Sequence, residues 1–141
     1  MDQRLNIITL GVSNLKDATL FYQEKFGWKM ASSSTETISF FQLNGILLSL
    51  YPKEKLAEDA QVSHKGNGFN GFALAYNTRT KNEVDHLFSD LEQKGVTIVK
   101  PPEDAFWGGY SGYVSDLDGN LWEIAFNPFL SLDDKGNAVE D

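Results

Sequence analysis

The sequence predicts an α+β fold in which one βαβββ module occurs twice. Two observations lead to this prediction. Apolar strand patterns and a helical pattern follow one another in the same order in residues 4–51 and again in residues 70–127. The glycines placed to end the two helices, Gly27 and Gly95, lie 68 residues apart, and the two hairpin turns lie about 74 apart. This spacing indicates a repeat in architecture rather than in residue identity.

The first module opens with a strand and a helix. Residues 5–12 are rich in Ile, Leu, Val and Thr, which favours a strand. Asn14 is placed to cap the helix that follows, and Asp17 favours the positive end of the helix dipole. Gly27 suits the left-handed residue that ends a helix. The apolar residues between them keep helical spacing: Leu15, Ala18, Phe21, Tyr22 and Phe26.

Three predicted strands complete the first module, at residues 28–32, 37–43 and 46–51. The last two are joined by Asn44-Gly45, which is the strongest two-residue hairpin signal in the chain. Residues 52–69 are charged and then rich in Gly and Asn, so the sequence predicts a linker there, with one helical turn.

The second module repeats this order. Its first strand is predicted at residues 72–76. A capping box, Thr80 to Glu83, predicts the start of the helix, and Gly95 predicts its end. A short strand at residues 97–100 is expected to stop at the two prolines that follow it.

The chain closes with a hairpin, residues 110–115 and 121–127, around an acidic turn. The sequence therefore predicts one domain, residues 1–128, and an acidic, flexible tail, residues 129–141. A ferredoxin-like βαββαβ fold is the alternative. It has one strand fewer in each half and leaves residues 103–127 without a place, so we favour the two βαβββ modules.

Composition limits the possible functions. The chain has 141 residues, a net charge of −8 and no cysteine, which excludes disulfides, thiolate metal sites and a cysteine nucleophile. An acidic surface repels nucleic acid and anionic lipid but attracts a cationic ligand. Residues 1–4 lead straight into a strand, and no apolar run approaches the about 18 residues of a membrane span. We therefore expect a cytoplasmic protein that binds neither nucleic acid nor membrane.

Several segments together resemble one family. The opening segment, residues 9–28, and the stretch from Phe106 to Tyr113 that runs into Asp116 to Glu123 are similar to the vicinal oxygen chelate proteins, the glyoxalase/bleomycin-resistance/dioxygenase superfamily. The resemblance spans about residues 4–128. It implies that each module curls a sheet, that the two sheets form a U-shaped cleft, and that the protein is a homodimer.

In metal-using members of that family, His and Glu side chains from four strands hold Zn, Ni, Fe or Mn. At the four corresponding positions, this chain has Ile, Leu, Gly and Glu. Ile and Leu side chains have no lone pair for a metal, and glycine has no side chain, so only the glutamate could bind one. We therefore expect no metal and no other cofactor. By resemblance, the four positions are Ile7, Leu48, Gly71 and Glu123.

A divalent metal would be expected only if this assignment of positions is wrong. A shift of one residue offers only weak ligands in place of the first three: Asn6, Ser49 and Asn70. His64 lies in the predicted linker and His86 lies between the apolar rows of the second helix, so both are expected to be solvated surface histidines.

Two groups of residues are candidates for ligand contact. Glu123 lies within the last predicted strand, where it could act as a general base, anchor a ligand cation, or bond to backbone. The aromatic run Phe106, Trp107 and Tyr110 is interleaved with glycines, so it can bend around a flat or cationic molecule, or else cap the core, as Tyr113 is expected to do. The resemblance adds strand positions that would face the cleft: Ile7, Thr9, Leu48, Leu50, Gly71 and Ala73.

These observations favour a metal-free protein of the bleomycin-resistance type, which sequesters a small cationic or aromatic ligand without chemistry. One alternative is a metal-dependent glyoxalase-like lyase, isomerase or dioxygenase that acts on vicinal oxygens, with Glu123 as the catalytic residue. The second alternative is a structural dimerisation module. Fold alone does not decide among the three.

Overall fold

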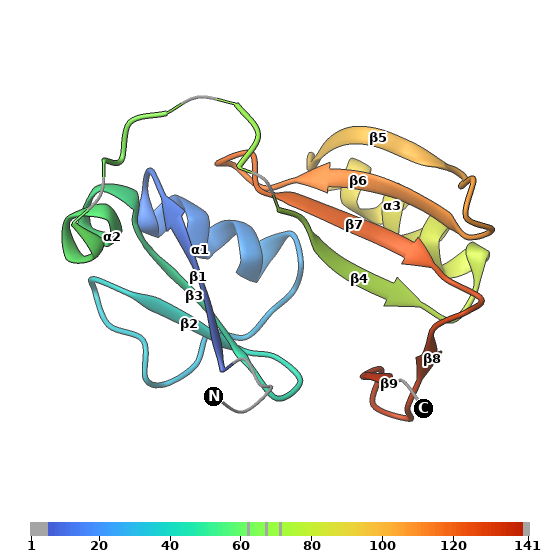
Figure 1. The fold of residues 1–141 in the computed structure, drawn as a ribbon. Coiled ribbons are helices and arrows are strands. Elements are labelled where there is room, and N and C mark those ends of the chain that lie inside the picture. Colours follow the sequence, from blue (N-terminus) through green and yellow to red (C-terminus); the bar gives the residue numbers. More distant parts are fainter. Residues whose placement is uncertain (1–5, 62, 67, 71, 140–141) are drawn as a thin grey trace. The chain divides into compact units, whose positions relative to one another are not determined.

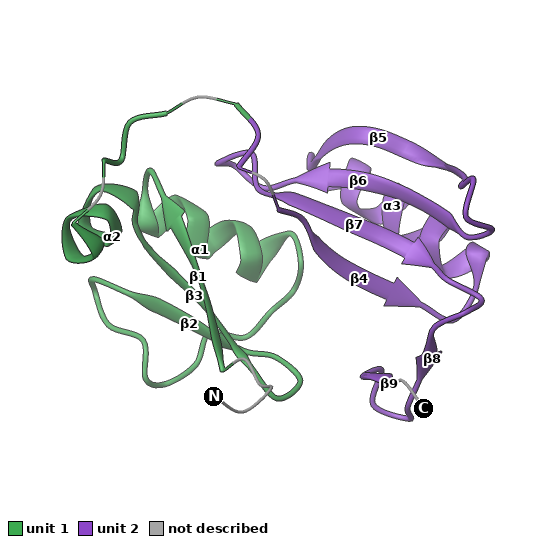
Figure 2. Cartoon of the chain, viewed as in Figure 1, with its two compact units in different colours: residues 1–68 green, residues 69–141 purple. Residues whose placement is uncertain are grey.

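The computed structural model describes residues 6–61, 63–66, 68–70 and 72–139. The chain forms two compact units, Met1–Gly68 and Phe69–Asp141 (Figure 2). Each unit has its own sheet and a long helix packed on that sheet (Figure 1). Among the described residues, no helix is long and apolar enough to cross a membrane.

The first unit is a three-stranded sheet with two helices. Its elements in chain order are β1 (Ile7–Val12), α1 (Leu15–Glu24), β2 (Ser39–Gln42), β3 (Leu47–Pro52) and α2 (Lys53–Ala60). The strand order is β1-β3-β2, so β3 is central; it pairs parallel with β1 and antiparallel with β2.

Both ends of α1 form as the sequence predicts. The Asn14 side chain accepts a hydrogen bond from the Asp17 amide at 2.9 Å. Gly27 adopts φ +71°, and the Trp28 amide donates to the Tyr22 carbonyl at 3.0 Å. The apolar face of α1 then packs on the sheet. The buried core of the unit includes Leu10, Val12, Phe21, Tyr22, Phe41, Leu48 and Leu50.

The strand predicted at residues 28–32 does not form. Only one antiparallel bridge, Met30 to Phe41, marks its place beside β2. The Ser34 hydroxyl accepts the hydrogen bond of the Phe40 amide at 2.9 Å. A side chain thereby takes a donor that a further ladder bond would need, which is the competition that serine offers to secondary structure.

The segment predicted as a linker begins with a helix of two turns, α2, where the sequence predicts a single turn. Ala57 of this helix is buried, and α2 packs against β1 and β3. Gln61 ends the helix with φ +56°, in the left-handed region. Burial of one apolar side of a short helix outweighs its weak sequence signal.

The second unit is a complete βαβββ module. Its elements are β4 (Leu74–Thr78), α3 (Lys81–Gln93), β5 (Thr97–Asp104), β6 (Tyr110–Ser115) and β7 (Leu121–Phe126). The order is β4-β7-β6-β5, with β4 and β7 parallel and the other pairs antiparallel. The first unit has the same connectivity with its second strand reduced to the Met30 bridge, so the predicted internal repeat is confirmed.

The ends of α3 also confirm the prediction. The Thr80 hydroxyl accepts from the Glu83 amide at 3.2 Å, but the Glu83 carboxylate accepts from the Arg79 amide, one residue earlier than in a standard capping box. At the other end Gly95 adopts φ +76°, and the Val96 amide donates to the Leu91 carbonyl at 2.9 Å. That pair of features is a Schellman motif.

Strand β5 continues through Pro101 and Pro102, where the sequence predicts a stop. Proline has no N–H to donate to a neighbouring strand. Because β5 lies at the edge of its sheet, it pairs on one side only, and a missing donor on the outer side interrupts no hydrogen bonds. Its pairing with β6 shifts register twice, between Ile98 and Lys100 and again between Lys100 and Glu103. The bulges accommodate the prolines and extend the strand to Asp104.

The acidic turn between β6 and β7 is built around Asp116. Its carboxylate accepts from the Asp118 amide at 3.0 Å and from the Asn120 amide and side chain, both at 2.8 Å. Gly119 supplies the left-handed residue, with φ +78°. Both Asp116 and Asn120 are buried, so the turn belongs to the folded core of the unit.

The same turn recurs near the C-terminus, where the sequence predicts a flexible tail. Asp133 accepts from the Lys135 amide and from the Asn137 amide and side chain, at 2.7–2.9 Å. The turn joins β8 (Ser131–Leu132) to β9 (Ala138–Val139) in an antiparallel hairpin. The Arg79 guanidinium donates to the carbonyls of Leu132 and Asp133, which attaches this hairpin to the end of β4.

The two turns generate a matched test of stability. We expect Asp116→Ala to lower the free energy of unfolding by about 3 kcal/mol, because a buried carboxylate and three charge-assisted hydrogen bonds are lost. Asp133→Ala removes the same bonds from a more exposed turn and should have a clearly smaller effect. Urea unfolding followed by tryptophan fluorescence compares them, and equal losses would contradict the role assigned to the first turn.

Candidate functional site

Each sheet has one face covered by its long helix and an opposite face, which we call the far face. In the second unit a methyl group added at Gly112 would lie 2.6 Å from Phe88 of α3. A side chain at position 112 would therefore point toward α3. Tyr110 points the same way, because its hydroxyl donates to Asp85 of α3. Because side chains alternate along a strand, Ser111 and Tyr113 point to the far face.

The strand register places four side chains in one row across that far face. Glu123 of β7 lies opposite Ala75 of β4 on one side and opposite Tyr113 of β6 on the other. Tyr113 in turn lies opposite Lys100 of β5. The row therefore reads Ala75, Glu123, Tyr113, Lys100, with a small residue beside the carboxylate and an aromatic ring between the two charges.

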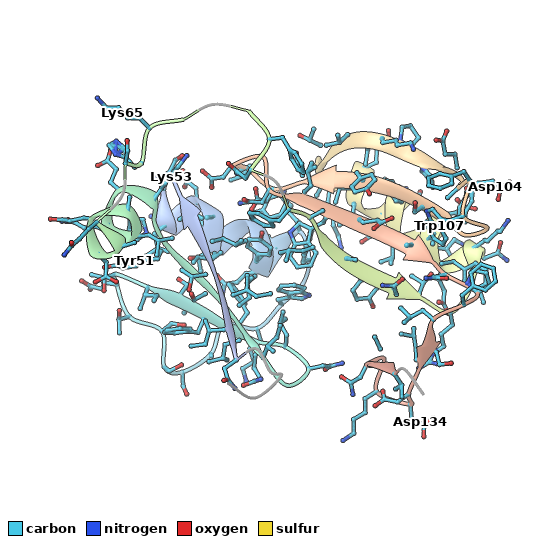
Figure 3. The ribbon with its side chains drawn as sticks, viewed as in Figure 1. Tyr51, Lys53, Lys65, Asp104, Trp107 and Asp134 are labelled. Carbon is cyan, nitrogen blue, oxygen red and sulfur yellow. The ribbon has the colours of Figure 1, made fainter. Side chains whose placement is uncertain are left out.

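A floor of small side chains lies next to this row. Ser111 and Ala125 are opposite one another and both are buried. Beyond them, a methyl group added at Gly109 would lie 1.8 Å from the Trp107 ring, so the indole occupies the space that any other residue would need. Figure 3 shows Trp107 at the end of the second sheet where β5 turns into β6. Two aromatic residues, Trp107 and Tyr113, thus flank a floor of small residues.

Glu123 is the central polar group of this face. Its side chain is half-buried, and Ala75 and Ala125 beside it are too small to cover it. Within the part of the chain that the structure describes, no donor forms a hydrogen bond with its carboxylate. A carboxylate that is partly desolvated and has no internal donor is suited to accept hydrogen bonds or charge from a ligand.

Lys100 is the cationic group of the same face. Its Nζ lies 2.7 Å from the Glu103 carboxylate, and both side chains are more than half exposed. The hydrogen bond and charge of Glu103 raise the pKa of Lys100, and Tyr113 and Glu123 act in the same direction. The electrostatic influence of Glu123 on Lys100 is consistent with the row described by the strand register.

The structure separates the aromatic residues that the sequence groups together. Trp107 and Tyr113 lie on the far face, whereas Phe106 is fully exposed at the tip of the turn. Tyr110 points the other way: its hydroxyl donates to Asp85 at 2.7 Å, and Lys81 lies 5.4 Å from its ring centroid. The sequence interpretation of Tyr110 as a ligand contact is therefore not supported, because strand alternation directs it to α3.

The predicted contact residues on the strands of the first unit also lie on two different faces of their sheet. Ile7 and Thr9 lie on the far face, where Ser49 donates a hydrogen bond to Thr9 at 2.6 Å. Leu48 and Leu50 alternate with Ser49 and are fully buried on the α1 side. Leu48 and Leu50 have no exposed surface, which makes them core residues on the α1 side. Ser49 lies on the far face but is also buried, at 1% exposed, so ligand contact at these positions stays a prediction.

Two further predicted positions belong to the start of the second unit. Ala73 is exposed and lies just before β4. Gly71 lies outside the described residues. Ala73 adds no polar side chain to this unit.

Sequence reasoning missed Lys100, Glu103 and Ser111. Ser111 follows from simple alternation once β6 is placed. The other two lie on the far face only because of the register shifts in β5. The paired prolines within that strand were the available signal, since proline in a strand marks an edge or a bulge.

The donor set does not fit a tightly bound transition metal. Among the described residues, no group of three or more His, Asp or Glu side chains is arranged to hold a metal ion. Of the described positions assigned by resemblance, Ile7 and Leu48 in the first unit have no side-chain donor, and Glu123 in the second unit has a carboxylate. His86 is exposed on α3, and His64 is 40% exposed and 3.8 Å from Glu54, as expected for surface histidines.

This chain resembles known proteins both in sequence and in fold. The sequence model of the Glyoxalase/Bleomycin resistance protein/Dioxygenase superfamily matches residues 4–124. A glyoxalase-related enzyme from Fulvimarina pelagi is 36% identical, with a TM-score of 0.87 over 98% of each chain. Metallothiol transferase FosB from Lysinibacillus sphaericus is 27% identical over 86% of this chain and 81% of its own length.

A lactoylglutathione lyase from Agrobacterium tumefaciens has a TM-score of 0.70 at 21% identity, covering 90% of this chain and 96% of that one. This last likeness concerns the fold alone. Together the comparisons confirm the predicted family resemblance and the predicted α+β fold with curled sheets.

The placement of Tyr110 generates a pH prediction. The hydrogen bond to Asp85, with burial and the charge of Asp85, raises the pKa of Tyr110 from 10.0 to about 12. A raised pKa means that the bond stabilises the fold below pH 10 and that this stability is lost as the pH rises through about 12. In Asp85→Asn the pKa of Tyr110 should fall toward 10, measured by ultraviolet titration of the phenolate.

Asp90→Asn is the matched control for that measurement. Asp90 lies on the same helix, where it accepts from Lys94 at 2.7 Å. Its substitution should leave the late-titrating phenol in place. A tyrosine titration unchanged by Asp85→Asn would contradict the assigned hydrogen bond.

Proposed function

The chain belongs to the Glyoxalase/Bleomycin resistance protein/Dioxygenase superfamily, and we propose that within it this protein binds a small, flat, cationic organic molecule without a metal ion. The ligand rests on the far face of the second sheet. Its positive charge is held by Glu123, and its flat surface lies against Tyr113 and Trp107. The proposal concerns binding; it assigns no reaction to the protein.

The arrangement of Glu123 carries this proposal. The carboxylate stands between Ala75 and Tyr113 on neighbouring strands. The alanine leaves room for a ligand, and the tyrosine offers an aromatic ring to it. A carboxylate and aromatic rings on one surface are the two features that recognise organic cations.

The net charge adds support. The value of −8 concentrates cations near the surface and speeds their encounter with the protein. Ser111 and Ala125 are small and buried between Trp107 and Tyr113, so the ligand contacts fall to the two rings and Glu123.

Metal-dependent chemistry is the alternative that the names of similar proteins raise, because they include a metallothiol transferase and a lactoylglutathione lyase. Those activities are stated for those proteins. In the first unit the corresponding positions, Ile7 and Leu48, have no side-chain donor for a metal, and in the second unit the corresponding position holds the Glu123 carboxylate. The donor chemistry therefore favours an organic ligand.

The binding proposal predicts a requirement for the Glu123 charge. Flat cations such as tryptamine, benzylamine and proflavine should raise the melting temperature, because a ligand that binds the native state stabilises it. Glu123→Gln keeps the size of the side chain but removes its charge, and we expect it to weaken binding at least about tenfold by calorimetry. Glu92→Gln, an exposed carboxylate of α3, is the control and should bind as the native protein does.

A metal titration tests the alternative. Calorimetry of dialysed protein with Zn²⁺, Ni²⁺, Mn²⁺ and anaerobic Fe²⁺ should show no tight one-to-one binding, because the described donors do not converge. Stoichiometric binding that is abolished by Glu123→Ala would overturn the metal-free proposal. It would also make the lyase, isomerase or dioxygenase alternative the leading one.

A further inference from the structure

We propose that the ligand is a flat zwitterion, whose anionic group is bound by Lys100 while its cationic group is bound by Glu123. This inference rests on the proposed function and deepens it by naming the ligand class. The two charged residues stand at either side of Tyr113 in one row of the far face. A ligand that carries both charges can therefore lie across the tyrosine ring and meet a partner at each end.

The bulge in β5 is the reason Lys100 belongs to this row. Ile98 pairs with Val114, and the next paired residue is Lys100, opposite Tyr113. Val99 is the additional residue. Without it, continuous pairing would place Lys100 opposite Gly112, on the α3 side.

Bulges of this kind redirect side chains, and they are found often next to binding sites. The second register shift has the same effect on Glu103, which lies opposite Ser111 of the far face. Two irregularities in one edge strand thus place one cation and one anion beside the proposed ligand. Strand protection alone would be satisfied by charges on either face.

The ion pair between Lys100 and Glu103 leaves Lys100 available. The pair is 2.7 Å long, and its side chains are 51% and 61% exposed. Exposed pairs of this kind contribute little to stability, since water and salt compete with them. A ligand carboxylate or phosphate can replace Glu103 as the partner of Lys100, and Glu103 then returns to water.

The spacing of the row sets the separation of the ligand charges. Neighbouring strands lie about 4.8 Å apart, so the backbones at Glu123 and Lys100 are about 10 Å apart across two strand intervals. Both side chains can lean over the ring between them. A ligand with charges at opposite ends of one aromatic ring matches this distance better than an amino acid, whose charges share one carbon.

Three probes that share one benzene ring and differ in their charged substituents test the inference. Benzylamine carries the cation alone, benzoate carries the anion alone, and 4-(aminomethyl)benzoate carries both. Binding to the full chain is measured by calorimetry and by nuclear magnetic resonance titration of the backbone amides. We expect 4-(aminomethyl)benzoate to bind at least about fivefold tighter than benzylamine, because a second charge-assisted contact forms.

Substitutions on β5 identify the source of that gain. Lys100→Gln should bring the affinities of benzylamine and 4-(aminomethyl)benzoate to within about twofold of one another, because the contact to the carboxylate is lost. Lys100→Arg should keep the difference. Glu103→Gln removes the internal competitor and should increase it. Lys94→Gln is the control, because Lys94 forms a similarly exposed 2.7 Å pair with Asp90 on α3.

The outcomes separate the two proposals. If benzylamine binds and requires Glu123, but 4-(aminomethyl)benzoate gains nothing or its gain survives Lys100→Gln, the zwitterion inference is overturned and the binding function stands. If none of the probes, including the flat cations above, binds to the protein, the proposed function fails and the inference fails with it.

Discussion

The register of the β6–β7 hairpin is the constraint on which the far face of the second sheet depends. In a sheet, a slip of one residue moves every side chain of a strand to the opposite face. The Asp116 turn fixes this register through three hydrogen bonds to a single carboxylate. Glu123 thereby lies opposite Tyr113, and Trp122 and Ile124 enter the core beside α3. The same turn thus determines both the packing of the unit and the position of its candidate ligand anchor.

The edge strand β5 shows how irregular backbone contributes to a site. A regular strand would place Val99 opposite Tyr113, and the far face would then lack a cation. The bulges change that pairing, and they also protect an edge that contains two prolines and several charges from pairing with other chains. The residues that protect the edge of the sheet therefore also belong to the proposed binding face. The bulges interrupt the hydrogen bonds to one neighbouring strand only, because β5 lies at the edge of the sheet.

The two units carry similar folds with different surfaces. In the first unit the far face bears hydroxyls, Thr9 and Ser49, which bond to each other, and the start of α2 closes one end of it, because a methyl group added at Gly11 would lie 3.2 Å from Lys53. In the second unit the corresponding face bears an acidic and a basic residue, Glu123 and Lys100, on either side of Tyr113. The described far faces of the two units therefore differ in their side chains, although the units share one connectivity.

The sequence by itself determined the elements that depend on near neighbours. The sequence showed the caps at Asn14 and Thr80, the glycines that end the helices and the Asn44-Gly45 hairpin, because each is set by hydrogen bonds or periodicity within a few residues. The family resemblance was readable from the order and spacing of motifs over about residues 4–128. Only the tertiary structure decided which face each strand residue occupies. Leu48 and Ser49 are both buried but lie on opposite faces of their sheet, and Lys100 lies in the row of Glu123. Pairing with distant strands sets the face of each residue, and one extra residue in a bulge reverses it. That reversal comes from contacts between strands. The paired prolines signal a bulge in β5, but they do not show which of its residues turns to the far face.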